Sequence, residues 1–160
     1  MSSLQRCLKY LDQRQVLYNH TTHSQAFSAS EVASVERMPK SMFAKTIVIF
    51  RPSHGFAMAV LPADCEISLR ELGASLEEVP RLATEAELER LFPNCELGAM
   101  PPLGVLYNMP VFVDEKLAQE EFIAFNACTH TDSIHMSYAD YARLTHPIRL
   151  RFAFHLARAR

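Results

Sequence analysis

Glycine is scarce in this sequence. There are four glycines in 160 residues, and two of them fall in FPNCELGAMPPLG, residues 92–104, together with three of the nine prolines. No GxGxxG, Walker or HExxH pattern occurs, so a nucleotide-binding loop and a zinc-protease helix find no support. Because proline fixes φ and glycine admits close backbone approach, we expect a stiff loop here. It is either a structural turn or the preorganised wall of a small pocket.

Paired cysteines are also missing. Cys7, Cys65, Cys95 and Cys128 are far apart and form no CxxC motif. A zinc ribbon or a thioredoxin motif is therefore not predicted. We expect free, buried thiols in a reducing compartment.

Long apolar runs are absent as well. The longest, such as TIVIF and FAMAVL, have the length of strands and are far too short to span a membrane. The N-terminal segment has no apolar run typical of a signal peptide. We therefore expect a soluble cytoplasmic protein with no membrane partner.

Excess positive charge is lacking, since the formal net charge is −2. This argues against a non-specific nucleic-acid coat, which needs a broad basic surface. A local basic segment does occur at the C-terminus, with Arg149, Arg151, Arg158 and Arg160. It could be a solvated tail, a contact to an RNA backbone or a basic amphipathic membrane segment.

Hydrophobic residues make up 49% of the chain, enough for one core, and the length favours one domain over residues 1–160. Apolar periodicity predicts helices over residues 2–15, 29–38, 69–74, 85–92 and 137–144, and strands over 16–20, 42–50, 56–61, 110–114, 121–127 and 133–136. Residues 148–156 could be strand or helix. Capping-box patterns at Ser28, Thr84 and Ser68 mark three helix starts.

The predicted fold class is mixed α/β (α+β). Long, regular helical crossovers are missing, so a doubly wound sheet is not expected. We expect a mixed, largely antiparallel sheet or barrel surrounded by short helices.

Lys45 stands inside the strongest predicted strand. Its ammonium could lie on an exposed face, or it could point into a cavity and hold an anion such as a phosphate. His20 and His23 sit in an early loop, as surface or ligand-rim groups.

Asn126, Cys128, His130 and His135 gather near a strand end and turn. Histidines five apart do not share a strand face, so a metal pair is not predicted. His130 could act as an acid, a base or a hydrogen-bond donor, and Cys128 could be a nucleophile or an ordinary buried thiol.

Four segments in order resemble the YbaK/prolyl-tRNA-synthetase-associated family of editing domains. They are SASEVASVERMPKSMFAKTIVIF, FAMAVLPADCEISLREL, RLATEAELERLFPNCELGAMPPLG and FIAFNACTHTDSIHMSYADYARL. The resemblance covers roughly residues 15–147, and the GxxxP motif at residues 98–102 is its most distinctive part. The basic residues 148–160 lie beyond it.

The resemblance implies a trans-acting deacylase that hydrolyses the ester of mischarged aminoacyl-tRNA, with Ala- or Cys-tRNA for proline as its commonest substrates. Lys45 then matches the family lysine, which holds the terminal adenosine and supports hydrolysis, and Thr46 touches the same nucleotide. The implied wall of the aminoacyl pocket consists of Gly98, Ala99, Met100, Pro101, Pro102, Asn126, Cys128 and His130. Cys128 stands where the family usually has glycine.

The implied partners are the 3′ acceptor end of aminoacyl-tRNA and a synthetase on which the domain docks. No cofactor and no metal are expected, and oligomeric state is left open. Two other functions stay open at this point: a non-catalytic module that binds an aminoacyl ligand or a synthetase, and a thiol hydrolase that uses Cys128.

Overall fold

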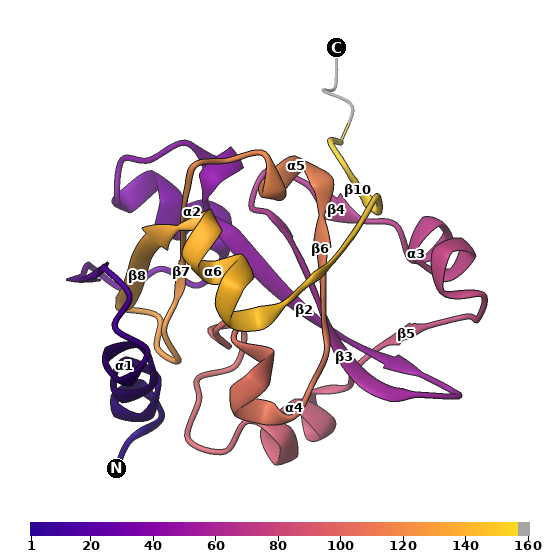
Figure 1. Ribbon diagram of the computed structural model, residues 1–160, viewed down its shortest axis with the longest axis horizontal. Helices are drawn as coiled ribbons and strands as arrows, with labels where there is room; N and C mark the ends of the chain where they lie inside the picture. The colour runs from indigo at the N-terminus through magenta and orange to yellow at the C-terminus, as the bar shows by residue number, and fades with distance from the viewer. Residues whose placement is uncertain (157–160) are drawn as a thin grey trace.

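The computed structural model describes residues 1–156 (Figure 1). The helices are α1 (Ser3–Gln13), α2 (Ala29–Val35), α3 (Leu69–Leu76), α4 (Glu85–Leu91), α5 (Glu115–Ala118) and α6 (Tyr138–Thr145), with 3-10 turns η1 (Lys40–Met42) and η2 (Gly104–Tyr107). The strands are β1 (Tyr18–Thr22), β2 (Ala44–Arg51), β3 (Gly55–Pro62), β4 (Glu66–Ile67), β5 (Arg81–Leu82), β6 (Val111–Asp114), β7 (Phe122–Asn126), β8 (Asp132–Ser137), β9 (Ile148–Leu150) and β10 (Ala153–Phe154). Within this part of the chain, no helix has the length and apolar character that crossing a membrane requires.

The strands form three sheets. Their orders are β5-β2-β3-β6-β9, β1-β8-β7 and β10-β4. Pairing is antiparallel except for β3 with β6 and β6 with β9. The predicted mixed, largely antiparallel α/β architecture is confirmed, and the sheets of the described residues stay open rather than closing into a barrel.

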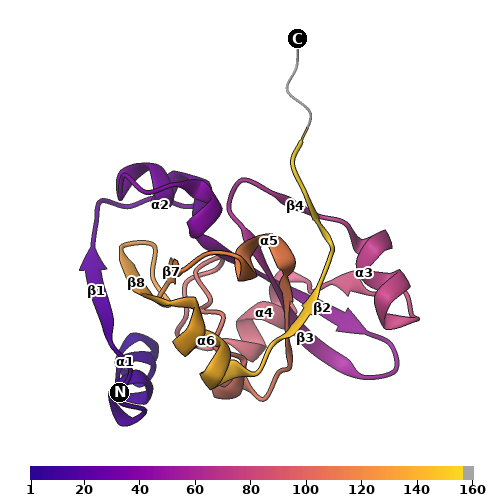
Figure 2. The same ribbon diagram turned by 45° about the horizontal axis from the view of Figure 1, so that its top comes forward.

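The two larger sheets meet at one point. Phe43, just before β2, forms an isolated parallel bridge with Ala124 of β7. Beyond this bridge the two strands separate, as Figures 1 and 2 show for the diverging paths of β2 and β7. Lys45 and Asn126 each follow two residues after the bridge, so both stand where the sheets part.

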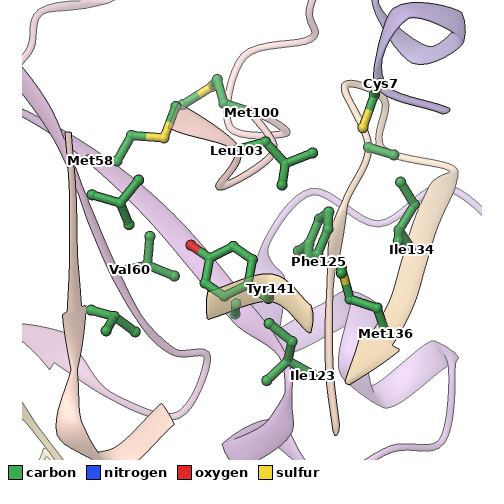
Figure 3. Close-up of a cluster of buried hydrophobic side chains, with 14 of the residues drawn as sticks. Cys7, Met58, Val60, Met100, Leu103, Ile123, Phe125, Ile134, Met136 and Tyr141 are labelled. Atoms are coloured by element: carbon green, nitrogen blue, oxygen red, sulfur yellow. The ribbon is translucent and has the colours of Figure 1, made fainter. Parts of the chain in front are cut away.

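Side-chain alternation along β2 divides the core between two faces. Ala44 and Val48 belong to the main cluster, which includes Met58, Met100, Leu103, Phe125 and Tyr141 (Figure 3). Ile49 belongs to a second cluster beneath α3 and the C-terminal strands. Phe43 and Ala124 pack against α2 in a third cluster. Burial of these apolar faces is what holds the open sheets together.

The local signals predicted most elements, with differences at their ends. Ser28, Ser68 and Thr84 each accept a hydrogen bond from the backbone N–H three residues on, as predicted. Only Thr84 completes the reciprocal box, because Glu31 accepts from Phe27 N–H instead. Helix α2 ends at Val35, earlier than predicted, because Arg37 adopts a left-handed φ of 57°.

The closing segment is strand rather than helix. It forms β9, parallel to β6, and β10, antiparallel to β4. Arg149 and Arg151 both pair with Glu115 on α5. Arg158 and Arg160 of the predicted basic tail lie outside the described residues.

Tyr141 anchors the proline-rich loop from the core. Its ring is buried, and its hydroxyl donates to the carbonyl of Pro102 over 2.8 Å. Tyr141→Phe should lower the free energy of unfolding by about 1–3 kcal/mol, because the buried carbonyl loses its partner. Urea unfolding checks this value. Tyr138→Phe, at a half-buried neighbour, is the matched control and should change stability much less.

Candidate active site

The GxxxP loop is fixed against the turn that follows β7. Cys128 N–H donates to the Ala99 carbonyl over 2.8 Å, and Glu96 N–H donates to the Cys128 carbonyl over 2.8 Å. Ala99 N–H is bonded to the Glu96 carbonyl. Both backbone groups of Ala99 are therefore used inside the protein, so a ligand at this loop would meet backbone groups of its other residues, such as Gly98 and Met100.

Two residues of this contact have positive φ. Gly98 has φ 87°, and a Cβ there would lie 3.7 Å from Cε1 of His130. Cys128 has φ 74°, a conformation that glycine adopts without cost and other residues adopt rarely. This explains physically why glycine suits position 128. The sulfur of Cys128 is buried and lies 3.8 Å from the hydroxyl of Tyr107, so it faces the interior rather than His130.

The thiols of Cys95 and Cys128 are neighbours. The hydrogen bond from Cys95 holds the pKa of Cys128 below its ordinary value, against the effect of burial and with help from the Tyr107 hydroxyl. The same bond to Cys128, with burial, raises the pKa of Cys95. Cys7 of α1 has its pKa raised, chiefly by burial. Three of the cysteines thus converge, which their spacing in the sequence did not suggest.

His130 is buried and held from several sides. Its backbone N–H donates to Oε2 of Glu96 over 2.6 Å, and its Nε2 lies 3.9 Å from the same oxygen. Its ring lies 5.2 Å from the exposed ring of Phe27, centre to centre. Glu96 and Phe27 were missed by sequence reasoning. Glu96 stands two residues before Gly98 in the proline-rich loop, and this position could have indicated that it belongs to the site. Nothing in the sequence indicated Phe27.

Unpartnered polar atoms coincide with the predicted site. Across residues 1–156, the buried side-chain oxygen and nitrogen atoms without a hydrogen-bond partner are Thr46 Oγ1, Asn126 Oδ1 and His130 Nδ1. Buried polar groups are normally paired, so each such atom calls for an explanation. All three belong to residues predicted for substrate binding.

Strand alternation decides which of these residues share a face. Lys45 lies on the same side of β2 as Phe43, and Asn126 lies on the same side of β7 as Ala124, so both face the third cluster and the loop before α2. Thr46 lies on the opposite side with Ala44 and Val48. The structure therefore holds His130 against the loop at Gly98 and places Lys45 and Asn126 two residues beyond the bridge, on the sides that carry Phe43 and Ala124. Thr46 lies on the other side of β2, and the sulfur of Cys128 faces Tyr107.

Lys45 is the cation of this junction. Its side chain is 20% exposed, and Nζ lies 3.6 Å from Oε1 of Glu66, itself 53% exposed. An ion pair this exposed is weak, so Glu66 can be displaced by an anionic ligand at little cost. Hollows of about 630 Å³ and 670 Å³ on the described surface lie elsewhere, beside Phe122 and along α3.

Comparison with known families decides the identity of this fold. The profile of the aminoacyl-tRNA editing domain matches residues 23–144. The chain belongs to this family. The predicted family resemblance and the prediction of an aminoacyl-tRNA hydrolase are confirmed at this level.

Similar proteins and structures are consistent with this family. The multifunctional Ser/Thr-tRNA deacylase ProXp-y of Escherichia coli is 27% identical over 153 residues, covering 92% of this chain and 91% of the relative. A structure described as a candidate trans-editing enzyme for prolyl-tRNA synthetase superposes with a TM-score of 0.81 at 18% identity, covering 96% of this chain and 98% of the other. The hypothetical protein APE2540 gives 0.84 at 16% identity, covering 93% and 99%. The last two show the fold alone.

Proposed function

We propose that this editing domain is a trans-acting deacylase that hydrolyses the ester of mischarged tRNA at the 3′ acceptor end. The observation that carries the proposal is the junction of β2 and β7. There a half-buried lysine and the buried, unpartnered Oδ1 of Asn126 each stand two residues beyond the Phe43–Ala124 bridge, and the unpartnered Nδ1 of His130 lies in the turn after β7. A site with these unmet hydrogen bonds fits a polar ligand with a phosphate nearby.

Ester hydrolysis transfers an acyl group to water. It needs an oriented water, a path for a proton and stabilisation of the oxyanion. In this scheme Lys45 exchanges Glu66 for the terminal adenosine and its phosphate, and its positive charge stabilises the developing oxyanion. Oδ1 of Asn126 accepts a hydrogen bond from the amino group. Nδ1 of His130 accepts from the attacking water, takes its proton as the water adds to the carbonyl carbon, and returns a proton to the ribose oxygen that leaves. The backbone of Gly98 and Met100 orients the ester, while Ala99, Pro101 and Pro102 hold the loop in shape.

Access to these atoms needs a small movement. Asn126 Oδ1 and His130 Nδ1 have no solvent exposure, so a ligand reaches them only when a neighbour shifts. Phe27 is 63% exposed and rests against His130, which makes it the side chain that moves at least cost. The scheme uses no metal, so a chelator should leave deacylation unchanged.

The substrate we favour carries a small hydroxyl side chain. The E. coli relative is a Ser/Thr-tRNA deacylase. Buried polar atoms without partners favour a substrate whose hydroxyl can form hydrogen bonds with them. Alanine or cysteine on tRNA for proline, the sequence-based expectation, is the competing pair of substrates. With tRNA as substrate, we propose a cytoplasmic location and docking on a synthetase.

A non-catalytic binding module is the second candidate, because Cys128 replaces the glycine usual in the family. Thermal shift with an amide-linked 3′-aminoacyl-adenosine and release of free amino acid from the ester separate the two. A deacylase gives both signals. A module that only binds gives the shift without release, which would contradict the proposal.

The thiol of Cys128 is a third candidate for the chemistry, and its lowered pKa favours reactivity. Its sulfur, however, is buried against Tyr107 and faces away from His130. We therefore expect Cys128→Ala to retain deacylation within about tenfold, measured as initial rate, since a nucleophile would lose far more. A loss comparable to that of Lys45→Ala would show instead that the thiol takes part in the reaction.

A further inference from the structure

A second cluster of side chains, all of types that can bind a metal ion, lies outside the candidate active site. Among the residues that the structure describes, Asp64, Cys65 and His155 are the one group of three or more histidine, cysteine or acidic side chains whose donor atoms lie within 4.8 Å of one another. We propose that they form a zinc site with an open fourth position.

The fold itself brings these residues together. Asp64 and Cys65 form the corner between β3 and β4, where Cys65 N–H bonds to the Pro62 carbonyl. Strand β10 pairs antiparallel with β4, with Phe154 opposite Glu66, so the next residue, His155, falls opposite Cys65. Figure 2 shows this C-terminal segment running beside β4. Buried Asp114 anchors the segment by accepting from the N–H groups of Phe152 and Ala153.

The distances already resemble a coordination sphere. Nε2 of His155 lies 3.3 Å from Oδ2 of Asp64, and Sγ of Cys65 lies 3.6 Å from the other carboxylate oxygen, Oδ1. One donor atom from each of the three residues lies within 4.8 Å of the other two, so a turn of the carboxylate presents a single oxygen to both partners. Zinc bond lengths are about 2.0–2.1 Å to oxygen or nitrogen and about 2.3 Å to sulfur. The edges of a tetrahedron built from them are about 3.3 Å between oxygen and nitrogen and about 3.5 Å between oxygen and sulfur. An ion fits between these atoms after small side-chain rotations.

The donor set selects the metal. A thiolate, an imidazole and a carboxylate together suit zinc, whereas magnesium and calcium prefer oxygen alone. Side-chain exposure rises from buried Cys65 through Asp64 to exposed His155, so the fourth position opens to water.

Binding should release a proton. Burial, followed by the nearby charge of Asp64, raises the pKa of Cys65 to about 11, so the free thiol is protonated near neutral pH. The positive charge of Lys116, whose ammonium donates to the Ala153 carbonyl, opposes this rise, and the charge of Asp114 adds to it. Zinc displaces the proton, and affinity should therefore weaken as the pH falls.

The test uses reduced, chelator-treated full-length protein. Calorimetric titration with zinc should give one ion per chain, and cobalt(II) should give a sulfur-to-cobalt charge-transfer band with the strong visible bands of tetrahedral geometry. Cys65→Ser should abolish the charge-transfer band. Cys65→Ser and Asp64→Asn should each weaken zinc binding by about 100-fold or more, because second-shell changes alone cost 10–100-fold.

The matched control is His54→Ala. His54 lies 2.7 Å from Glu78 in an exposed histidine–carboxylate pair that lacks a thiol, and its loss should leave zinc affinity unchanged. Absence of saturable binding, or binding that Cys65→Ser leaves intact, would overturn the proposal. If Cys65→Ser fails to fold, Asp64→Asn decides by the same criterion. The site adjoins Glu66 but uses neither Lys45 nor His130, so these outcomes are independent of deacylation.

Discussion

Lys45→Ala is expected to lower kcat/KM for deacylation by about 10²–10³-fold, the usual cost of losing one preorganised electrostatic group in an active site. The reason is its position. Lys45 stands on the side of β2 that carries Phe43, two residues beyond the bridge to β7, and among the described residues its ammonium pairs with the exposed carboxylate of Glu66. Initial rates of amino acid release, with stability checked by thermal unfolding, give the measurement.

Lys40→Ala is the matched control for this variant. Lys40 lies in η1, close in sequence to Lys45, and its side chain is exposed. The Lys40→Ala variant therefore loses the same charge but keeps Lys45, the cation of the candidate site. We expect its rate to stay within a factor of about two of the wild type, as for a screened surface charge. Equal rates for Lys45→Ala and wild type at saturating substrate would remove Lys45 from the mechanism.

Gly104→Ala is expected to have the largest effect on stability. A Cβ at this position would lie 2.2 Å from the carbonyl oxygen of Met109 and 2.7 Å from Cγ2 of Val111. Both neighbours are buried, and the first is backbone, so neither can yield without moving β6. Overpacking of this severity should cost about 3 kcal/mol or more in the free energy of unfolding. Chemical denaturation measures it directly.

Gly55→Ala separates crowding from backbone strain. Gly55 has φ 82°, and a Cβ there meets nothing within 4 Å. This variant should therefore lose only about 1 kcal/mol, the cost of placing a side chain in a left-handed conformation. If the two variants proved equally stable, crowding at Gly104 would not be the reason for that glycine.

Much of the fold could be predicted because local signals and packing agree. Ser68 and Thr84 cap their helices, and the largely apolar, β-rich residues 42–50 predict a central strand, which β2 is, between β5 and β3. Strand β4 and helix α5 were missed because two- and four-residue elements carry almost no periodicity. The pairing of β10 with β4 depends on buried Asp114, 38 residues before Phe152, which no local pattern reveals.

The candidate site was predicted in part. The GxxxP loop and His130 come together because a backbone hydrogen bond joins Cys128 to Ala99. Two features of the site could be recognised only in the three-dimensional structure. Thr46 follows Lys45 in sequence but points to the other face of β2, and Glu96 and Phe27 reach His130 through contacts that span the fold. The positive φ of Cys128 likewise explains a substitution that sequence alone could only note.

The central claim is that this editing domain cleaves mischarged aminoacyl-tRNA, and a deacylation panel tests it most directly. Catalytic amounts of protein would be mixed with radiolabelled Ser-, Thr-, Ala-, Cys- and Pro-tRNA, with Lys45→Ala and Lys40→Ala in parallel. We predict multiple-turnover release from at least one of the first four species, fastest for serine or threonine, lost in Lys45→Ala and kept in Lys40→Ala. Release from none of them by the wild-type protein would contradict the account and favour a module that only binds.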